Sequence, residues 1–139
     1  MPSTYRVIES IGNERLHQLM ELYKHEWWTN NRTIEHTQAI LKGSDVVIGI
    51  CDEADDRLVA FARVLTDRIA RAFIFDVIVA ADQRGRGLGR WVVDRVLEHP
   101  EVKSVELVEL YCRPELVPFY ERMGFSSPDS GVVLMRRRL

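Results

Sequence analysis

The chemistry that the sequence indicates most clearly belongs to a short turn rich in glycine and arginine. This turn, Arg84–Arg90, holds three glycines and three arginines within seven residues. Glycines let a backbone approach a phosphate closely, and the first N–H groups of a helix lack carbonyl partners and lie at the positive end of its dipole. Guanidinium groups add charge-assisted hydrogen bonds. We therefore expect this turn to bind an anionic ligand such as a diphosphate.

The turn lies between a predicted strand and a predicted helix. Phe73–Val79 is an apolar run of strand length, and after the turn apolar residues recur at helical spacing until shortly before Pro100. Two common phosphate motifs do not fit. The sixth position counted from Gly85 is Arg90 instead of the last glycine of a Rossmann fingerprint, and Gly89 is not followed by the lysine of a P-loop.

Two motifs of the chain resemble the signatures of one enzyme superfamily. Arg84-x-x-Gly87-x-Gly89 after a strand is similar to the acetyl-coenzyme A signature of the GNAT superfamily of N-acetyltransferases. The segment 117–125, VPFYERMGF, resembles the closing helix and strand of that family, written roughly F-Y-x-x-x-G-F. Both motifs stand in the family's order and spacing. The resemblance therefore implies an acetyl-coenzyme A-dependent N-acetyltransferase.

The order of the remaining elements also resembles the GNAT fold, over essentially the whole chain. The fold class that we expect is α+β (mixed α/β), with a central, mixed, mostly antiparallel sheet of six to seven strands flanked by about four helices. Apolar patterning and turn residues predict strands at 4–9, 45–51, 58–65, 73–79, 104–112 and 132–136, and helices that begin near 14, 33, 90 and 115.

The resemblance implies a particular geometry at the centre of this sheet. The strands that match Phe73–Val79 and Val105–Tyr111 begin as parallel neighbours and splay apart. The pantetheine arm of acetyl-coenzyme A is expected to lie in the gap between them.

Composition limits the class of protein further. The 139 residues are 46% apolar, which suits one core, so we expect a single domain over residues 1–139. The net charge of −2 gives no sign of a nucleic-acid or membrane partner. Two cysteines, together with the lack of an apolar run near the about 20 residues of a membrane helix, favour a reduced, cytoplasmic protein. The four histidines show no ligand spacing, so we expect no metal.

The resemblance assigns the cofactor to the strand and the turn. The amides of pantetheine are expected to pair with backbone groups of Ile78 and Val79, and the N–H of Val79 matches the family's donor to the oxyanion. The diphosphate is expected to contact the turn residues Arg84, Gly85, Arg86, Gly87, Leu88, Gly89 and Arg90.

Tyr120 matches the tyrosine with which family members commonly protonate the departing thiolate of coenzyme A. A phenol with a pKa of about 10 can donate a proton to a thiolate whose reference pKa is roughly 8.5. In this role Tyr120 would contact the cofactor as well as act in catalysis. The alternative is a core aromatic residue on an amphipathic helix, as Phe119 is expected to be.

The acceptor amine needs a base, because a primary amine with a pKa of about 10.4 arrives protonated. Asp76 is the carboxylate of the central strand, whereas several family members place a catalytic glutamate where this chain has Phe75. Asp76 is a candidate base or amine anchor, and a structural carboxylate or a water relay to another acid remain open alternatives. Glu26 and Trp28 lie in the region that usually sets specificity in this fold, and they are candidates for the acceptor pocket.

The leading hypothesis is acetyl transfer to a primary amine, of a small molecule, by direct attack on the thioester of acetyl-coenzyme A. The alternatives are a coenzyme A-binding regulatory module without acetyl transfer, and a protein N-acetyltransferase. A domain that binds anionic partners such as RNA is disfavoured by the net charge and by the lack of aromatic residues among the arginines of the turn. Dimers are common in the resembled family, often through terminal strands, so Val132–Met135 is a candidate interface of a homodimer.

Overall fold

The computed structural model describes residues 4–28, 31–127 and 131–139. Its strands are β1 (Tyr5–Ile8), β2 (Val46–Asp52), β3 (Arg57–Thr66), β4 (Arg71–Val79) and β5 (Leu107–Leu110). Its helices are α1 (Asn13–Lys24), α2 (Ile34–Gly43), α3 (Leu88–Glu98) and α4 (Val117–Glu121), with short 3₁₀ turns η1 (Ala81–Gln83) and η2 (Pro114–Leu116). In this described part of the chain, every helix is too short or too polar to cross a membrane.

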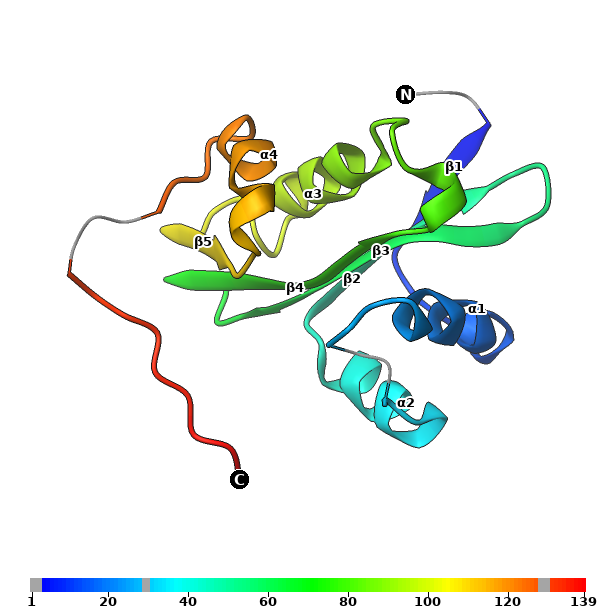
Figure 1. The fold of residues 1–139 in the computed structure, drawn as a ribbon, viewed down its shortest axis with the longest axis horizontal. Helices are drawn as coiled ribbons and strands as arrows, with labels where there is room; N and C mark the ends of the chain where they lie inside the picture. The colour runs from blue at the N-terminus through cyan, green and yellow to red at the C-terminus, as the bar shows by residue number, and fades with distance from the viewer. Residues whose placement is uncertain (1–3, 29–30, 128–130) are drawn as a thin grey trace.

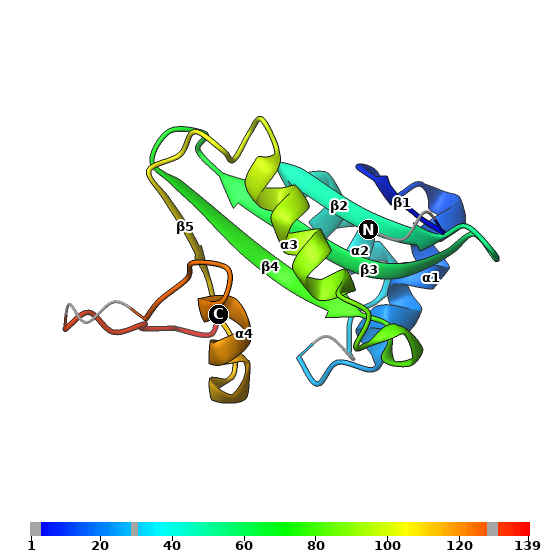
Figure 2. The ribbon, with the colours of Figure 1, turned by 90° about the horizontal axis from the view of Figure 1, so that it is seen from above.

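The strands form one sheet in the order β1-β2-β3-β4-β5. Neighbours from β1 to β4 pair antiparallel, whereas β4 and β5 pair in parallel. Helices α1 and α2 lie on one face of the sheet and α3 covers the other, with α4 close to β5 (Figure 1, Figure 2). This mixed sheet between helices confirms the predicted α+β architecture.

Strand β3 is apolar on both faces because helices cover both of them. On the α1 side, the ring of Tyr23 packs edge-on against Phe61, with 6.0 Å between ring centroids. On the opposite side, α3 contributes Val92, Val93 and Val96, all fully buried. These two layers hold β4, whose last residues lead into the glycine turn.

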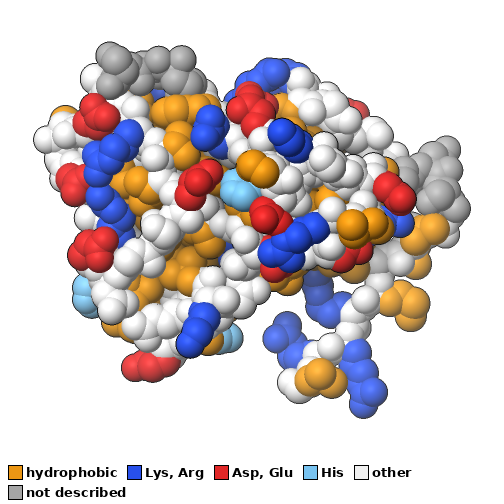
Figure 3. Space-filling model, turned by 180° about the vertical axis from the view of Figure 1, so that it is seen from behind, with side chains coloured by type: hydrophobic (Ala, Val, Ile, Leu, Met, Phe, Trp, Pro, Cys, Tyr) orange, Lys and Arg blue, Asp and Glu red, His pale blue; other side chains and the backbone are white. Residues whose placement is uncertain are grey.

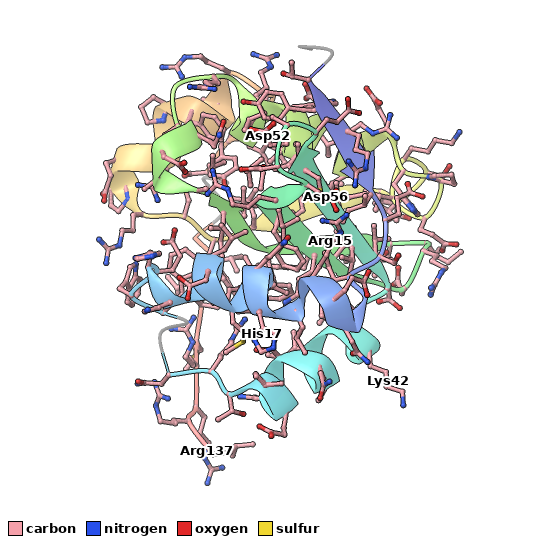
Figure 4. All side chains as sticks on the ribbon, turned by 90° about the vertical axis from the view of Figure 1, so that its right-hand side faces the viewer. Arg15, His17, Lys42, Asp52, Asp56 and Arg137 are labelled. Carbon is pink, nitrogen blue, oxygen red and sulfur yellow. The ribbon has the colours of Figure 1, made fainter. Side chains whose placement is uncertain are left out.

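The turn between β2 and β3 is tied to α1 by an ion pair. Asp56 accepts a 2.9 Å hydrogen bond from Nη2 of Arg15, and Arg6 of β1 pairs with the same carboxylate. Figure 4 shows Arg15 and Asp56 side by side between the helix and the hairpin. Hydrogen bonds from Arg6 and Arg15 lower the pKa of Asp56 below its ordinary value. The contact fixes the start of α1 against the sheet.

The predicted final strand, Val132–Arg136, is not formed, and that prediction was wrong. Residues 131–139 have no regular structure, and the side chains of Val132, Val133 and Met135 are largely exposed. A strand is stable only when its backbone groups are paired, and among the described residues this segment pairs with no strand of the sheet. Among the described residues the sheet therefore has five strands, fewer than the six to seven expected.

The fourth helix is shorter than the predicted segment 115–123. It spans Val117–Glu121 and follows the 3₁₀ turn Pro114–Leu116. Because proline has no backbone N–H, Pro118 is compatible only with the first turn of a helix. Tyr120 nevertheless lies within the helix, as predicted.

Candidate active site

Strands β4 and β5 separate part of the way along β4. Their parallel pairing begins at Arg71 and Leu107 and ends at Ile74 and Leu110. Strand β4 continues to Val79, so its last five residues have no partner strand on the β5 side among the residues that the structure describes. The predicted splay of these two strands is therefore present, and it leaves a row of backbone groups available beside the glycine turn.

A bulge decides which backbone groups face this gap. Phe75 pairs with Arg63, but Ile78 pairs with Phe61, so β4 carries one residue more than β3 in between. Asp76, in the bulge, has a positive φ of 57°. The bulge thus lies at the start of the unpaired edge of β4.

After the bulge, the amide of Val79 faces the gap. The N–H of Ala80 donates to the carbonyl oxygen of Val59 on β3 at 2.8 Å, and successive N–H groups of a strand point to opposite edges. Val79 therefore directs its N–H away from β3, whereas the backbone of Ile78, which pairs with Phe61, faces β3. The backbone contact to pantetheine that we expected from Ile78 is corrected by this register, and Val79 keeps its candidate role.

The glycine turn leads directly into α3. Gly85 and Gly87 have φ of 79° and 80°, and a Cβ atom added to either would meet no atom of a described residue within 4 Å, its two chain neighbours aside. The first hydrogen bond of α3 runs from Trp91 N–H to the carbonyl oxygen of Gly87 at 3.0 Å, which leaves the N–H groups of Leu88, Gly89 and Arg90 without helical partners. The turn therefore offers open space and unpaired donors, which fits an anion.

Gly89 serves a different purpose from the other two glycines. A Cβ atom at Gly89 would lie 3.2 Å from Cζ of Phe119 and 3.6 Å from Cγ2 of Val79. The absence of a side chain lets α3, α4 and the end of β4 approach one another. Gly89 thus brings the anion-binding turn to the gap.

The arginine side chains of the turn are engaged with other protein groups in this structure. Arg84 donates through Nε to the carbonyl oxygen of Val79 at 3.3 Å and through Nη2 to Glu26 at 3.5 Å. Arg86 donates to the hydroxyl of Tyr5 at 3.2 Å, a contact that raises the pKa of its guanidinium. Arg90 pairs with Asp94 one turn further along α3, with 3.7 Å between the charged groups. A phosphate in the turn would meet backbone donors first and the arginines only after these contacts opened.

Tyr120 lies on α4, where its ring packs against those of Phe119 and Phe125 at centroid distances of 4.9 and 5.9 Å. Its side chain is buried, and this burial, followed by the nearby Cys112, raises the pKa of the phenol to about 12. The phenol is therefore protonated at neutral pH and able to donate. This packing is compatible with both hypotheses for Tyr120, a core aromatic residue and the proton donor to the thiolate.

Asp76 is the centre of a buried polar cluster on the α1 side of the sheet. Its carboxylate accepts hydrogen bonds from Arg32 Nη1 and Arg63 Nε at 2.8 Å each, from Tyr23 Oη at 3.1 Å, and from Trp28 Nε1 at 3.3 Å. The side chain of Asp76 is only 4% exposed. The cluster joins α1, the loop after it, β3 and β4.

This surrounding changes the chemistry that Asp76 can perform. Burial alone would raise the pKa of its carboxyl group, but hydrogen bonds and charges of Arg32 and Arg63 outweigh burial and hold that pKa below the ordinary value. The carboxylate is thus ionised at neutral pH and already occupied by four donors. The geometry favours the structural alternative for Asp76 over the general base.

Glu26 lies beyond the end of α1, next to the glycine turn. It lines a cavity of about 420 Å³ together with Ile78, Val79 and Arg84. Burial raises the pKa of Glu26, and the charge of Arg84 partly offsets this effect. The structure thus brings Glu26 to the end of β4, while Trp28 lies at Asp76, so both residues of the expected acceptor pocket adjoin the strand.

Arg63 is one of the residues of this site that the sequence pattern did not single out. The guanidinium of Arg63 stacks on the ring of Phe75, with 4.7 Å between its Cζ and the ring centroid. Phe73 lies 4.7 Å from Phe75 and 4.5 Å from Tyr111, measured between ring centroids. One feature of the sequence could have identified it: Arg63 is the single charged residue in the otherwise apolar predicted strand 58–65. Arg63 is thus in contact with a group of packed aromatic rings, those of Phe75, Phe73 and Tyr111.

Comparisons with known proteins agree with this geometry. The model of the Acetyltransferase (GNAT) family matches residues 13–125. The chain is 29% identical over 127 residues to the uncharacterized N-acetyltransferase ycf52 of Pyropia yezoensis, covering 90% of this chain and 72% of that protein. It is 28% identical over 134 residues to the glucosamine 6-phosphate N-acetyltransferase of Candida albicans, covering 96% of this chain and 84% of that enzyme.

A solved structure shows the same fold. The crystal structure of a protein from Xanthomonas campestris pv. campestris that belongs to the GNAT family superposes with a TM-score of 0.80 at 30% identity. The match covers 100% of this chain and 95% of that one. With the family match, the splayed strands and the glycine turn, these comparisons show that the chain belongs to the GNAT family of N-acetyltransferases.

Proposed function

We propose that the protein transfers the acetyl group of acetyl-coenzyme A to a primary amine of a small molecule, by direct attack of the amine on the thioester. One observation carries this proposal: the unpaired edge of β4 ends at the open, glycine-lined N-terminus of α3. A strand edge binds an amide-containing arm, and a helix N-terminus binds a phosphate. A ligand with both parts, as coenzyme A has, matches this juxtaposition.

The residues present fit such a cosubstrate, which supplies an activated acetyl group when bound. The N–H groups of Leu88, Gly89 and Arg90 are available for its diphosphate, and the edge of Val79 for its pantetheine arm. Arg84 is placed to add a charge-assisted hydrogen bond once it leaves Glu26. The open space beside Gly85 and Gly87 lets the phosphates reach these donors.

Two groups are proposed to act on the reacting atoms. The N–H of Val79, which faces the gap, donates to the carbonyl oxygen of the thioester as negative charge develops on it. Tyr120, which its raised pKa keeps protonated, donates its proton to the leaving sulfur, and burial favours this transfer because it disfavours the departing thiolate as well. The attack needs no cysteine nucleophile.

The acceptor amine is proposed to bind beside Glu26 and Trp28. Glu26 offers a carboxylate in a cavity next to Val79, where it can hold the ammonium group and, through water, accept its proton. Support for a small-molecule acceptor comes from the Candida albicans relative, which by its name acetylates glucosamine 6-phosphate.

A coenzyme A-binding module without acetyl transfer is the second candidate. The specific observation in its favour is that Asp76 is committed to four donors and Phe75 stands where a catalytic glutamate is expected. Under this alternative the turn and the strand edge would bind coenzyme A, and no amine would be acetylated.

Calorimetric titration with acetyl-coenzyme A, followed by release of free thiol in the presence of single amines, tests both candidates. Acetyl transfer predicts micromolar binding and thiol release that depends on the amine. Binding without amine-dependent release would favour the regulatory module. Acetylation of peptide lysines or N-termini in preference to every small amine would favour a protein N-acetyltransferase, and lack of binding would overturn the assignment of the turn.

A further inference from the structure

We propose that the acceptor carries an anionic group in addition to its amine, a carboxylate or a phosphate, and that Arg63 and Arg32 bind this group while Asp76 orients them. This inference rests on the proposed function and names the class of its substrate. It follows from the charge, the free donors and the position of the cluster around Asp76.

The cluster has more positive than negative charge. Two guanidinium groups, of Arg63 and Arg32, face the single carboxylate of Asp76. Their side chains are 12% and 17% exposed. In the parts of the chain that the structure describes, neither arginine has a second carboxylate partner. A surplus positive charge in a largely buried site is costly unless an anion joins it.

The same arginines have hydrogen-bond donors left for such an anion. A guanidinium has five N–H donors, and Asp76 receives bonds from Nη1 of Arg32 and Nε of Arg63. The remaining guanidinium nitrogens make no hydrogen bond to any described residue, and water reaches them. Planar pairs of N–H donors match the oxygens of a carboxylate or a phosphate, which a single lysine would not do as well.

The orientation of both guanidiniums is fixed in advance. Arg32 stacks on Tyr23 and Arg63 stacks on Phe75, each with 4.7 Å between the guanidinium carbon and the ring centroid. Together with the hydrogen bonds to Asp76, this stacking restrains the plane of each group, so binding an anion costs little side-chain entropy. Asp76 is in this view a positioning residue that does not take part in proton transfer.

The cluster also lies on the correct side of the sheet for an acceptor. It faces α1, whereas the anion-binding turn opens α3 on the opposite face (Figure 2). Asp76 precedes Val79 by three residues, about 10 Å along a strand. That distance suits one small molecule with its amine at the gap and its anionic group at the arginines. The ring of Phe75, on which Arg63 stacks, borders the cluster.

The test compares matched amines with and without an anionic group, using the wild-type protein and acetyl-coenzyme A. Tyramine is paired with tyrosine for the carboxylate, and glucosamine with glucosamine 6-phosphate for the phosphate. We expect kcat/KM to be at least about tenfold higher for the anionic member of one pair, mainly through a lower KM, because one charge-assisted contact suffices for that factor. The pair that shows the preference identifies the group.

Variants connect the preference to the cluster. In Arg32→Met and Arg63→Met the ratio of the two kcat/KM values is expected to fall toward one, and Arg32→Lys should restore part of it. Arg68→Met, which removes a guanidinium from the loop between β3 and β4, is the matched control and should keep the wild-type ratio. Calorimetric affinity for acetyl-coenzyme A reports whether each variant is folded.

The outcomes separate this inference from the proposed function. Equal or better use of tyramine and glucosamine by the wild-type protein overturns the anionic acceptor and leaves acetyl transfer intact. A preference that survives in folded Arg32→Met and Arg63→Met overturns the assignment to these arginines. Failure to acetylate any amine, despite binding of acetyl-coenzyme A, overturns the proposed function and this inference with it.

Discussion

Nη2 of Arg84 lies 3.5 Å from Oε1 of Glu26, so that an ion pair joins the chain after α1 to the first arginine of the glycine turn. The same guanidinium donates to the carbonyl oxygen of Val79. Glu26, which is expected to bind the amine, is thus paired with Arg84, which is expected to bind a phosphate of the cosubstrate. Binding of the cosubstrate would release Glu26 toward the acceptor, and this predicts that acetyl-coenzyme A binds first.

Glu26→Gln is expected to strengthen binding of acetyl-coenzyme A by about two- to fivefold, since an ion pair of which one partner is solvent-exposed and the distance is 3.5 Å contributes about 1 kcal/mol or less. The same substitution should raise the KM of the amine, because the anchoring charge is lost. Calorimetry and steady-state kinetics measure the two effects separately. Arg84→Met should weaken cosubstrate binding, and unchanged affinity in both variants would show that Arg84 takes no part in it.

Gly87→Glu is expected to abolish binding of acetyl-coenzyme A in calorimetric titration. The substitution places bulk and negative charge in the open space of the turn, at a φ of 80°. Gly131→Glu is the matched control, because it adds the same charge at another glycine of positive φ, in the C-terminal segment. Binding that survives in Gly87→Glu, or is lost equally in the control, would contradict the phosphate-binding role of the turn.

Tyr120→Phe is expected to lower kcat by about a hundredfold, the lower end of the range for loss of a general acid. The affinity for acetyl-coenzyme A should change little, because the ring still packs against Phe119 and Phe125. With a pKa raised to about 12, Tyr120 stays protonated, so it should cause no loss of wild-type rate between pH 7 and about 10. Equal kcat in both proteins would remove Tyr120 from the mechanism.

Asp76→Asn is expected to reduce the free energy of unfolding at pH 7 by about 3–5 kcal/mol, since two buried guanidiniums lose their counter-charge. Because the pKa of Asp76 is lowered by folding, its contribution is present above the ordinary value of 3.8 and is lost as pH falls below it. Urea unfolding at pH 7 and pH 3 should therefore show a smaller difference at the lower pH. If Asp76→Asn instead shifts the pH–rate profile between pH 6 and 9, Asp76 acts as the base after all.

The C-terminal segment leads us to propose a homodimer. Val132, Val133, Leu134 and Met135 are exposed, and Figure 3 shows hydrophobic and basic side chains along this segment, away from the body of the molecule. Deletion of residues 131–139 is expected to convert a dimer to a monomer in sedimentation. Replacement of Arg136, Arg137 and Arg138 by glutamine, which keeps the apolar residues, should leave the dimer intact. A full-length chain that sediments as a monomer would exclude this interface.

Local signals in the sequence predicted the elements around the turn well. A glycine at positive φ, a helical apolar period and a proline after it are properties of neighbouring residues, so Gly87, α3 and the end of β4 were all expected where they lie. The splay of β4 and β5 came from the family resemblance, because strand pairing cannot be read from either strand alone.

The surroundings of Asp76 could not be predicted in the same way. Its partners Arg32 and Arg63 are 44 and 13 residues away in the chain, and they meet it only when α1 and β3 pack against β4. The sequence left both a base and a structural carboxylate open at this position. The tertiary contacts, with their effect on its pKa, favour the second.

Because of the bulge at Asp76, the two ends of β4 pair with β3 in registers that differ by one residue. Before it, Ile74 faces Val64, and after it, Val79 faces Ala60. If β4 paired with β3 regularly, with no residue bulged out, Ala60 would face Ile78, and the amide that points into the gap would come from Ile78 instead of Val79. The edge of β4 would then present a different amide to the cofactor, although every side chain of the site would be the same. The bulge is thus as much a part of the candidate site as any side chain in it.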